Sequence, residues 1–300
     1  MFKHLIDIKN LDKQDILNLI RKAELFKSGE LHSSSAGKTV AMMFLENSTR
    51  TKCSFELAAK KLGLHVLNFE TSKSSFSKGE SLLDTLNNLY FIGVEAVVIR
   101  SGENGLLENT ASRLKYPLKL INAGEGNMSH PTQALLDFMT MTEKLGDIKG
   151  KRIAIAGDIK HSRVAKSNLE LLGKFGAKVK LCAPDYFKDE SIKNVTWYNN
   201  LAGAITAADV VMMLRVQRER HEQTDYSFED YVRDFGLTSE KLEKYAPDAV
   251  LMHPGPVNRD VEISSELLDG EKGLTILEQA RNGAYIRMAA LDEILSEGAK

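Results

Sequence analysis

Short apolar runs alternate with longer amphipathic stretches along most of the chain. Residues 40–44 and 210–214 are apolar at every position and have the length of strands. Strands of this kind are buried on both faces, which is typical of parallel sheets covered by helices. Between such runs, apolar residues recur at helical spacing, as at Phe55, Ala58 and Leu62. The pattern therefore predicts an α/β protein whose parallel sheets are flanked by helices.

The individual elements follow from the same pattern. We expect strands at residues 40–44, 96–99, 118–121, 152–156, 178–182, 210–214 and 249–252. We expect helices at residues 11–26, 48–62, 82–91, 130–145 and 163–175, and a last one marked by Ala284, Met288, Leu291 and Leu295.

Length and composition narrow the class of protein. A chain of 300 residues usually divides into two cores, and 40 Lys and Arg against 41 Asp and Glu give a net charge of −1. A nucleic-acid-binding protein would usually be strongly basic, and a membrane-spanning helix needs a longer apolar run. Cys53 and Cys182 are too few for a disulfide framework or a zinc site. We therefore expect a cytoplasmic protein with two buried, reduced thiols, no metal, and neither nucleic acid nor membrane as a partner.

Polar and mostly cationic residues directly follow the predicted strands. Ligands of parallel sheets bind beyond the carboxyl ends of the strands, so these residues are expected at one edge of each sheet. Their charges favour a ligand with several negative charges. In chain order they are Glu46, the run Ser48-Thr49-Arg50-Thr51, Arg100, His130, Gln133, Asp158, Arg163, Arg215, Gln217 and His253.

The run Ser48-Thr49-Arg50-Thr51 opens a predicted helix. Free N–H groups at a helix start and the positive end of the helix dipole favour an anion, and an arginine can bind phosphate oxygens in a forked geometry. The same run also fits a plain helix cap followed by a surface arginine, and taken alone it is more often that. No G-x-G-x-x-G fingerprint is present, so Gly157 after a strand does not indicate a dinucleotide site.

Three stretches resemble signatures of the carbamoyltransferases. Residues 44–56, which run from Phe44-Leu45 through the Ser-Thr-Arg-Thr run to Phe55-Glu56, are similar to the carbamoyl-phosphate signature of that family. Residues 130–137, which begin His-Pro-Thr-Gln, resemble the second signature. Residues 78–85, which begin Lys-Gly-Glu-Ser, resemble the flexible loop.

Further motifs resemble the aspartate branch of the family. They are Gly157-Asp158, Ser162-Arg163, Arg215-Val216-Gln217 and His253-Pro254-Gly255-Pro256. The Ser-Met-Gly and His-Cys-Leu-Pro motifs expected of the ornithine branch are absent. The resemblance spans nearly the whole chain, and by it the chain is identified as a member of the aspartate carbamoyltransferase catalytic chains.

The resemblance implies a reaction and a domain organisation. Such enzymes transfer the carbamoyl group of carbamoyl phosphate to the amine of L-aspartate, giving N-carbamoyl-L-aspartate and phosphate, in an early step of pyrimidine biosynthesis and without a cofactor. The implied domains are a carbamoyl-phosphate-binding domain of residues 1–131 with 284–300 and an aspartate-binding domain of residues 132–283. The C-terminal helix is expected to pack back on the first domain.

Roles for single residues are also implied by the resemblance. The residues implied to be catalytic are Arg50, Thr51, Arg100 and His130. Those implied to bind carbamoyl phosphate are Ser48, Thr49, Arg50, Thr51, Arg100, His130, Gln133, Gly255 and Pro256. Those implied to bind aspartate are Lys78, Arg163, Arg215 and Gln217. No side chain stands out as a general base.

The resemblance implies an assembly and a motion as well. A homotrimer with shared sites is implied, in which Ser74 and Lys78 enter the site of a neighbouring subunit. Closure of the two domains would involve Glu46, Arg163 and Arg220. Association with a regulatory chain, or with other chains of the pyrimidine pathway, stays open.

Two other interpretations of the sequence stay open. One is a carbamoyltransferase that uses a different amine acceptor, although Arg163 and Arg215 favour a dicarboxylate. The other is a non-catalytic phosphometabolite-binding protein, which could have lost His130, Gln133 or Arg215, whereas this chain has all three.

Overall fold

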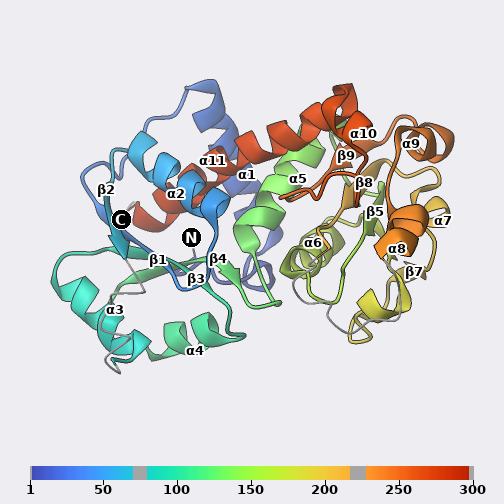
Figure 1. The fold of residues 1–300 in the computed structure, drawn as a ribbon. Coiled ribbons are helices and arrows are strands. Elements are labelled where there is room, and N and C mark those ends of the chain that lie inside the picture. Colours follow the sequence, from blue (N-terminus) through green and yellow to red (C-terminus); the bar gives the residue numbers. More distant parts are fainter. Residues whose placement is uncertain (1, 70–79, 217–227, 297–300) are drawn as a thin grey trace. The chain divides into compact units, whose positions relative to one another are not determined.

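The computed structural model describes residues 2–69, 80–216 and 228–296, which form two compact units (Figure 1). The first unit comprises Met1–Leu136 and Asn282–Lys300, and the second comprises Asp137–Arg281. Each unit holds one parallel sheet with helices packed on it. The predicted fold class is therefore confirmed, including the return of the C-terminal helix to the first unit. No helix in the described ranges is long and apolar enough to span a membrane.

Strands and helices alternate along the chain in both units. The first unit contains α1 (Lys13–Ser28), β1 (Thr39–Phe44), α2 (Thr49–Lys61), β2 (His65–Phe69), α3 (Leu82–Phe91), β3 (Ala96–Ser101), α4 (Leu106–Arg113) and β4 (Lys119–Glu125). The second contains β5 (Arg152–Ala156), α6 (Arg163–Lys174), β6 (Lys178–Cys182), β7 (Thr196–Tyr198), α7 (Leu201–Ile205), β8 (Val210–Met213), α8 (Phe228–Phe235), α9 (Ser239–Tyr245), β9 (Val250–Met252) and α10 (Ser265–Asp269). Helices α5 (Pro131–Leu145) and α11 (Leu274–Leu295) each contribute residues to both units.

Both sheets reverse their strand order at one point. The first sheet has the order β2-β1-β3-β4, and the second has the order β7-β6-β5-β8-β9. All pairs are parallel, so in each sheet the chain starts in the middle, builds outward on one side, and then crosses to the other side. The crossing falls between β1 and β3 in the first sheet and between β5 and β8 in the second. Ligands of open parallel sheets bind at such switch points.

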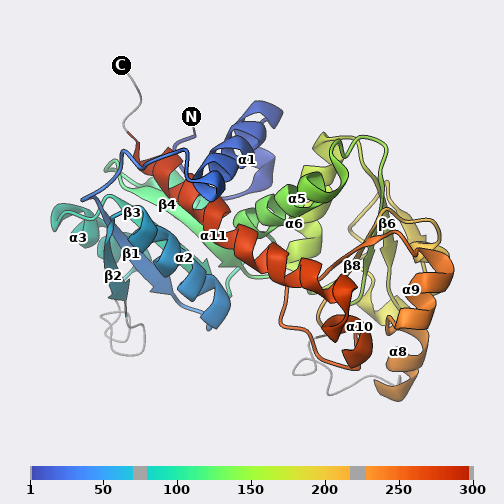
Figure 2. The same cartoon turned by 90° about the horizontal axis from the view of Figure 1, so that it is seen from above.

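Alternation of side chains divides the core of the first unit into two layers. On one face of the sheet, Ala41, Met43 and Val97 join a buried cluster with Leu86 of α3 and Leu107 of α4. The residues between them along the strands face the other side, where α2 and the last part of α11 cover the sheet (Figures 1 and 2). Residues 40–44 of β1 and 96–99 of β3 are apolar because both faces of the sheet are covered there.

The two cysteines differ in their surroundings. Cys182 is buried at the end of β6, and this burial raises the pKa of its thiol to about 12. Cys53 is exposed, so the predicted burial of both thiols is wrong for this residue. It lies on α2 between the buried residues Thr51 and Phe55, on the side of the helix that turns away from the sheet.

His4 joins the N-terminal segment to β4. Its Nδ1 accepts a hydrogen bond from the backbone N–H of Leu120 at 3.1 Å. Burial, together with the charges of Lys3 and Lys119, lowers the pKa of His4 from 6.5 to about 4. The folded state therefore binds fewer protons than the unfolded state between these two values. The stability contributed by neutral His4 is complete above about pH 6.5 and is lost as the pH falls towards 4.

Unfolding free energies measured at two pH values test whether protonation of His4 lowers stability. We expect the wild type to lose about 1–2 kcal/mol more free energy of unfolding between pH 7 and pH 4.5 than a His4→Gln variant, because partial exposure of the ring weakens the full effect. Urea unfolding at both pH values measures the difference. The glutamine oxygen can still accept from Leu120 but does not titrate, and equal pH dependence of the two proteins would contradict the prediction.

Candidate active site

The switch point of the first sheet brings Arg100 next to the end of β1. Phe44 and Arg100 are register partners, and Leu45 N donates to the carbonyl oxygen of Arg100 at 2.9 Å. Glu46 and Ser48 therefore continue from β1 directly beside the last residues of β3. The sequence predicted only that these residues share one edge of a sheet. The strand order shows that the two strands that carry them, β1 and β3, are directly paired.

Arg100 is held on two sides of its guanidinium. Nη1 donates to the carbonyl oxygen of Ala123 at 3.2 Å, and Nη2 lies 3.3 Å from Glu46 Oε1. The register between β3 and β4 shifts at this place, which brings the Ala123 carbonyl to the arginine. Arg100 is only 9% exposed, so its position is fixed by packing and by both partners.

Helix α2 begins one residue after Ser48. Ser48 has an extended backbone, but its side chain makes no capping hydrogen bond. The plain cap that the sequence suggested is therefore not what this serine forms. Thr49 and Arg50 are exposed, whereas Thr51 is buried on the sheet side. The first-turn N–H groups of α2 have no hydrogen-bond partner within the helix, and the Ser48 hydroxyl does not cap them. The start of α2 can therefore offer these donors to a ligand.

The start of α5 lies beyond the end of β4. Pro131 occupies the first helical position, where its missing N–H is not needed, and His130 precedes it. The His130 carbonyl accepts from Gln133 N at 3.0 Å, and His130 and Gln133 are 4% and 8% exposed. A tight turn supports this start, since Glu125 N donates to Ser129 O at 2.9 Å. Histidine and glutamine are thus buried polar groups fixed by the backbone.

We call the set Ser48, Thr49, Arg50, Thr51, Arg100, His130 and Gln133 the first-unit cluster. Arg100 lies near the end of β3, and the other members lie just before, or in the first turn of, the helices that follow β1 and β4. Together they combine two arginines, three hydroxyls and a helix start, which suits an anion with several oxygens.

The second unit has its own cluster of polar residues at its switch point. Gly157 directly follows β5 and has a φ of +131°, and a Cβ there would lie 2.8 Å from the carbonyl oxygen of Leu214. Only glycine lets the chain after β5 pass so close to the end of β8. Beyond it, buried Asp158 accepts from His161 N at 3.2 Å and lies 2.9 Å from its ring Nδ1. This contact shapes the loop that leads to Arg163.

Arg163 and Arg215 lie at neighbouring strand ends within this unit. Arg163 is the first residue of α6, whose cap is Ser162, with Oγ accepting from Ala165 N at 3.1 Å. Arg215 comes two residues after β8, which is the neighbour of β5. Both side chains are partly buried. The pair places two cations at one switch point, which suits a ligand with two carboxylates.

The other predicted residues fall in two groups. Gly255 and Pro256 follow β9 and are joined by a cis peptide bond, with Gly255 at a φ of +69°. Ser74, Lys78, Gln217 and Arg220 lie outside the described residues. Among the described residues, no group of three or more His, Cys, Asp or Glu could hold a metal ion.

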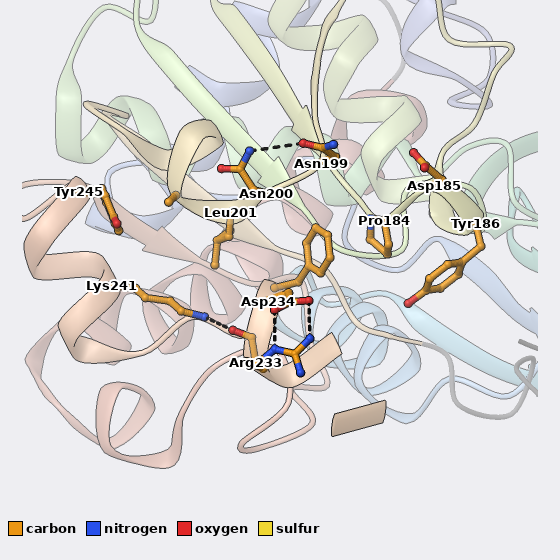
Figure 3. A pocket seen from close by; sticks show the side chains of 12 residues that line it. Pro184, Asp185, Tyr186, Asn199, Asn200, Leu201, Arg233, Asp234, Lys241 and Tyr245 are labelled. Atoms are coloured by element: carbon orange, nitrogen blue, oxygen red, sulfur yellow. Dashed lines mark hydrogen bonds and ion pairs between the residues drawn. The ribbon is translucent and has the colours of Figure 1, made fainter. Parts of the chain in front are cut away.

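A separate cavity of about 690 Å³ lies elsewhere in the second unit (Figure 3). It is lined by parts of α7, α8 and α9 and by residues 184–186. Arg233 is 2.8 Å from Asp234, and Lys241 Nζ donates to the carbonyl oxygen of Arg233 at 2.8 Å. Both cations that line it are thus already paired within the protein. Neither Arg163 nor Arg215 lines this cavity, so we do not assign it to the candidate site.

Comparison with known families settles the group to which the chain belongs. Residues 3–143 match the family described as "Aspartate/ornithine carbamoyltransferase, carbamoyl-P binding domain". Residues 149–294 match "Aspartate/ornithine carbamoyltransferase, Asp/Orn binding domain". The chain belongs to the aspartate/ornithine carbamoyltransferase family. The resemblance to the carbamoyltransferases is therefore confirmed at the level of this joint family, and the first-unit cluster lies within the first of the two matched domains.

Solved structures of carbamoyltransferases share this fold over almost the whole chain. Aspartate transcarbamoylase from Trypanosoma cruzi in complex with carbamoyl aspartate and phosphate has 28% identity and a TM-score of 0.87, over 98% of this chain and 96% of that one. The same enzyme with carbamoyl phosphate has 27% identity and a TM-score of 0.84, over 98% and 96%. Ornithine carbamoyltransferase from Thermus thermophilus has 24% identity and a TM-score of 0.87, over 99% and 100%, which shows the common fold.

Proposed function

We propose that this carbamoyltransferase uses L-aspartate as its acceptor and forms N-carbamoyl-L-aspartate and phosphate. The observation that carries the proposal is the pair Arg163 and Arg215 at the switch point of the second sheet. Ornithine has one carboxylate and a cationic side chain, which two arginines would repel, whereas aspartate has two carboxylates. The Trypanosoma cruzi aspartate transcarbamoylases that share the fold bind carbamoyl phosphate and aspartate, which supports the same substrates for this chain.

The first-unit cluster would bind carbamoyl phosphate. The start of α2 and the Arg50 guanidinium would hold the phosphate oxygens, and Gln133 would accept from the carbamoyl NH₂. Attack of the neutral aspartate amine on the carbonyl carbon moves negative charge onto the carbonyl oxygen. Thr51, Arg100 and His130 would donate to that oxygen as the charge develops, and donors of this kind typically contribute 10²–10³-fold to the rate.

In the second step of the reaction the tetrahedral intermediate collapses. The bond between the carbonyl carbon and the bridging phosphate oxygen would break with its electron pair going to that oxygen, and the departing phosphate would take up the proton that the amine loses. In the second unit, Arg163 and Arg215 would hold the aspartate carboxylates, and Gly255 and Pro256 would lie against the substrates. We assign the product to pyrimidine biosynthesis, because N-carbamoyl-L-aspartate is the intermediate that this pathway requires.

A direct assay of acceptors tests the proposal. Purified protein is given carbamoyl phosphate with aspartate or ornithine at equal concentration, and phosphate release and the carbamoylated product are measured. We expect turnover with aspartate and none above background with ornithine. Preference for ornithine would replace the proposed acceptor, and absence of turnover with both would favour a non-catalytic phosphometabolite-binding protein.

Ser48→Ala separates helix capping from ligand binding. Loss of a working serine cap usually costs about 0.5–2 kcal/mol of stability. Since Ser48 makes no capping bond, we expect the free energy of unfolding to change by less than about 0.5 kcal/mol. The KM for carbamoyl phosphate should rise about 10-fold or more, because a hydrogen bond to a charged ligand is lost.

A matched control is Thr238→Ala. Thr238 Oγ1 does accept from Lys241 N at 3.2 Å, at the start of α9. This variant should lose stability while keeping its KM for carbamoyl phosphate. The opposite pattern, with Ser48→Ala destabilised and its KM unchanged, would return Ser48 to a structural role.

We also propose a homotrimer in which Ser74 and Lys78 complete the site of a neighbouring subunit. Mixed Lys78→Ala and Arg50→Ala subunits test this arrangement. A hybrid contains sites that combine the intact Arg50 of one subunit with the intact Lys78 of the next, so activity should return on mixing although each variant alone is inactive. No return of activity in hybrids confirmed by mass would exclude the shared site.

Closure of the two domains on the substrates is part of the same proposal, with Glu46, Arg163 and Arg220 as its charged groups. Within the first unit, Glu46 lies 3.3 Å from Arg100. A change at Glu46 would therefore affect the placement of Arg100 as well as closure.

A further inference from the structure

Glu262 is fully buried between the segments that follow β8 and β9. Its exposed fraction is 0%. The backbone on both sides of it is held, since Leu237 N donates to the Glu262 carbonyl oxygen at 2.9 Å and Asp260 N donates to Ile263 O at 2.9 Å. The carboxylate thus projects from a fixed part of the chain.

The Glu262 carboxylate joins two segments that are far apart in sequence. Oε1 accepts from Val216 N and from Asn258 Nδ2, both at 2.8 Å, and Oε2 accepts from Asn258 N at 2.6 Å. Asn258 Nδ2 also donates to the Val216 carbonyl oxygen at 3.1 Å. Val216 directly follows Arg215, and Asn258 lies two residues after Pro256. The carboxylate therefore cross-links the two segments that carry these candidate substrate contacts.

The Gly255-Pro256 turn, which precedes Asn258, is also held close to the Glu262 carboxylate. His253 Nδ1 accepts from Gly255 N at 2.7 Å, and its Nε2 lies 3.8 Å from Glu262 Oε2. The His253 backbone N–H in turn donates to Gln279 Oε1 at 3.0 Å. The Gly255-Pro256 turn is thus held by a buried histidine on one side and by the Glu262 carboxylate on the other.

Because the Glu262 carboxylate is buried, the link between the Val216 and Asn258 segments depends on the distance between them. Burial raises the pKa of Glu262, whereas the hydrogen bonds from Val216 and Asn258 and the charge of Arg215 lower it. A carboxylate in a buried place is costly unless donors satisfy it. Separation of the two segments would take away the Val216 N–H, while the two Asn258 donors would stay with the carboxylate. The buried Oε1 would then lose one of its two donors, so the bond favours one spacing of the segments. A neutral contact of similar size would resist such movement less.

We propose that Glu262 is a positioning residue of the aspartate half of the site, which fixes the segment carrying Arg215 relative to the Gly255-Pro256 turn. The inference rests on the proposed function, because it takes Arg215 as a clamp for an aspartate carboxylate. Forked arginine–carboxylate pairing needs correct placement of both nitrogens, and a misplacement of about 1 Å can cost 10²-fold in rate. Arg215 is one peptide unit from the Val216 N–H that Glu262 holds.

Glu262→Gln tests the role with little change of shape. The amide oxygen can accept one N–H, but the amide NH₂ group would face a second donor, so one link between the segments is lost. We expect the KM for aspartate to rise about 10-fold or more. Binding of inorganic phosphate by the first-unit cluster, measured by calorimetry, should stay within about twofold of the wild type. The matched control is Glu266→Gln, the same chemical change four residues on at an exposed position, which should alter neither value.

Each outcome decides the matter. An aspartate KM within about twofold of the wild type overturns the inference, and so does a loss of phosphate affinity and melting temperature in parallel, which shows a general structural role. If Glu262→Gln does not fold, Asn258→Ala replaces it, because this variant removes only the two Nδ2 bonds, and a several-fold rise in aspartate KM is then expected. If the wild type transfers the carbamoyl group to another acceptor but not to aspartate, the proposed function is wrong. The inference about Glu262 rests on that function and would be wrong as well.

Discussion

Replacement of Arg100 by alanine is expected to lower kcat about 10²–10³-fold, which corresponds to about 2.7–4 kcal/mol of transition-state stabilisation. Arg100 is 9% exposed and is fixed by the Ala123 carbonyl and the Glu46 carboxylate before any ligand arrives. A donor held in this way costs no reorganisation when charge develops on the carbonyl oxygen. The KM for aspartate should change much less than kcat. Steady-state kinetics with both substrates measures the split.

Two further variants make the Arg100 result specific. Arg113→Ala removes an exposed arginine at the end of α4 and should leave kcat unchanged. Arg100→Lys keeps the charge but not the forked donors, and it should recover only part of the lost rate. A kcat for Arg100→Ala within about threefold of the wild type would remove Arg100 from the chemical step.

Replacement of Arg215 by alanine is expected to lower kcat/KM for aspartate about 10²–10³-fold. Loss of one partner of a desolvated, hydrogen-bonded charge pair costs about 2–5 kcal/mol, much of it from the carboxylate left unpaired. Arg215 is partly buried beside the end of β8, so the pair would form away from bulk water. Binding of inorganic phosphate should not change, because the proposed phosphate ligands are in the first unit.

Arg152→Ala is the matched control for Arg215→Ala. Arg152 lies in the same sheet, but its side chain is 47% exposed and is paired with Asp209 at 3.2 Å. Exposed ion pairs contribute little to stability because solvent screens them, so this variant should keep its kinetics and lose little stability. Equal aspartate kinetics for the Arg152 and Arg215 variants would contradict a clamp at Arg215.

The strands and long helices could be predicted because the residues that they bury form apolar runs or helical periods along the sequence. Strand β1 lies between two layers of helices and is apolar from Val40 to Phe44, and α3 begins and ends where its apolar period does. Strand β2 was not predicted. It is the edge of its sheet, His65 and Leu67 are exposed, and no apolar run marks it. Strand β7 and helix α7 have three and five residues, too few to show a period.

The residues of the candidate site could be named from sequence, but their neighbours could not. The sequence places Arg100 after a strand, and only the strand order shows that this strand pairs with β1, next to Ser48. Glu262 was missed because nothing local distinguishes it from an exposed glutamate. Its burial is set by Val216 and Asn258, of which the first is 46 residues away in the sequence. Contacts between distant segments are fixed by topology, which a local pattern does not encode.

The path of α11 has a consequence for the order in which the two units can form during translation. The second unit ends at Arg281, whereas the first needs Asn282 onwards, although its sheet is made before residue 126. The missing part supplies buried Ile286 and Leu291, and Asp292, whose Oδ1 accepts from Ser33 at 2.7 Å. A nascent chain would thus carry an incomplete first unit while the second is already whole. The part synthesised first is completed last, so nascent chains arrested before residue 282 should stay protease-sensitive in the first unit.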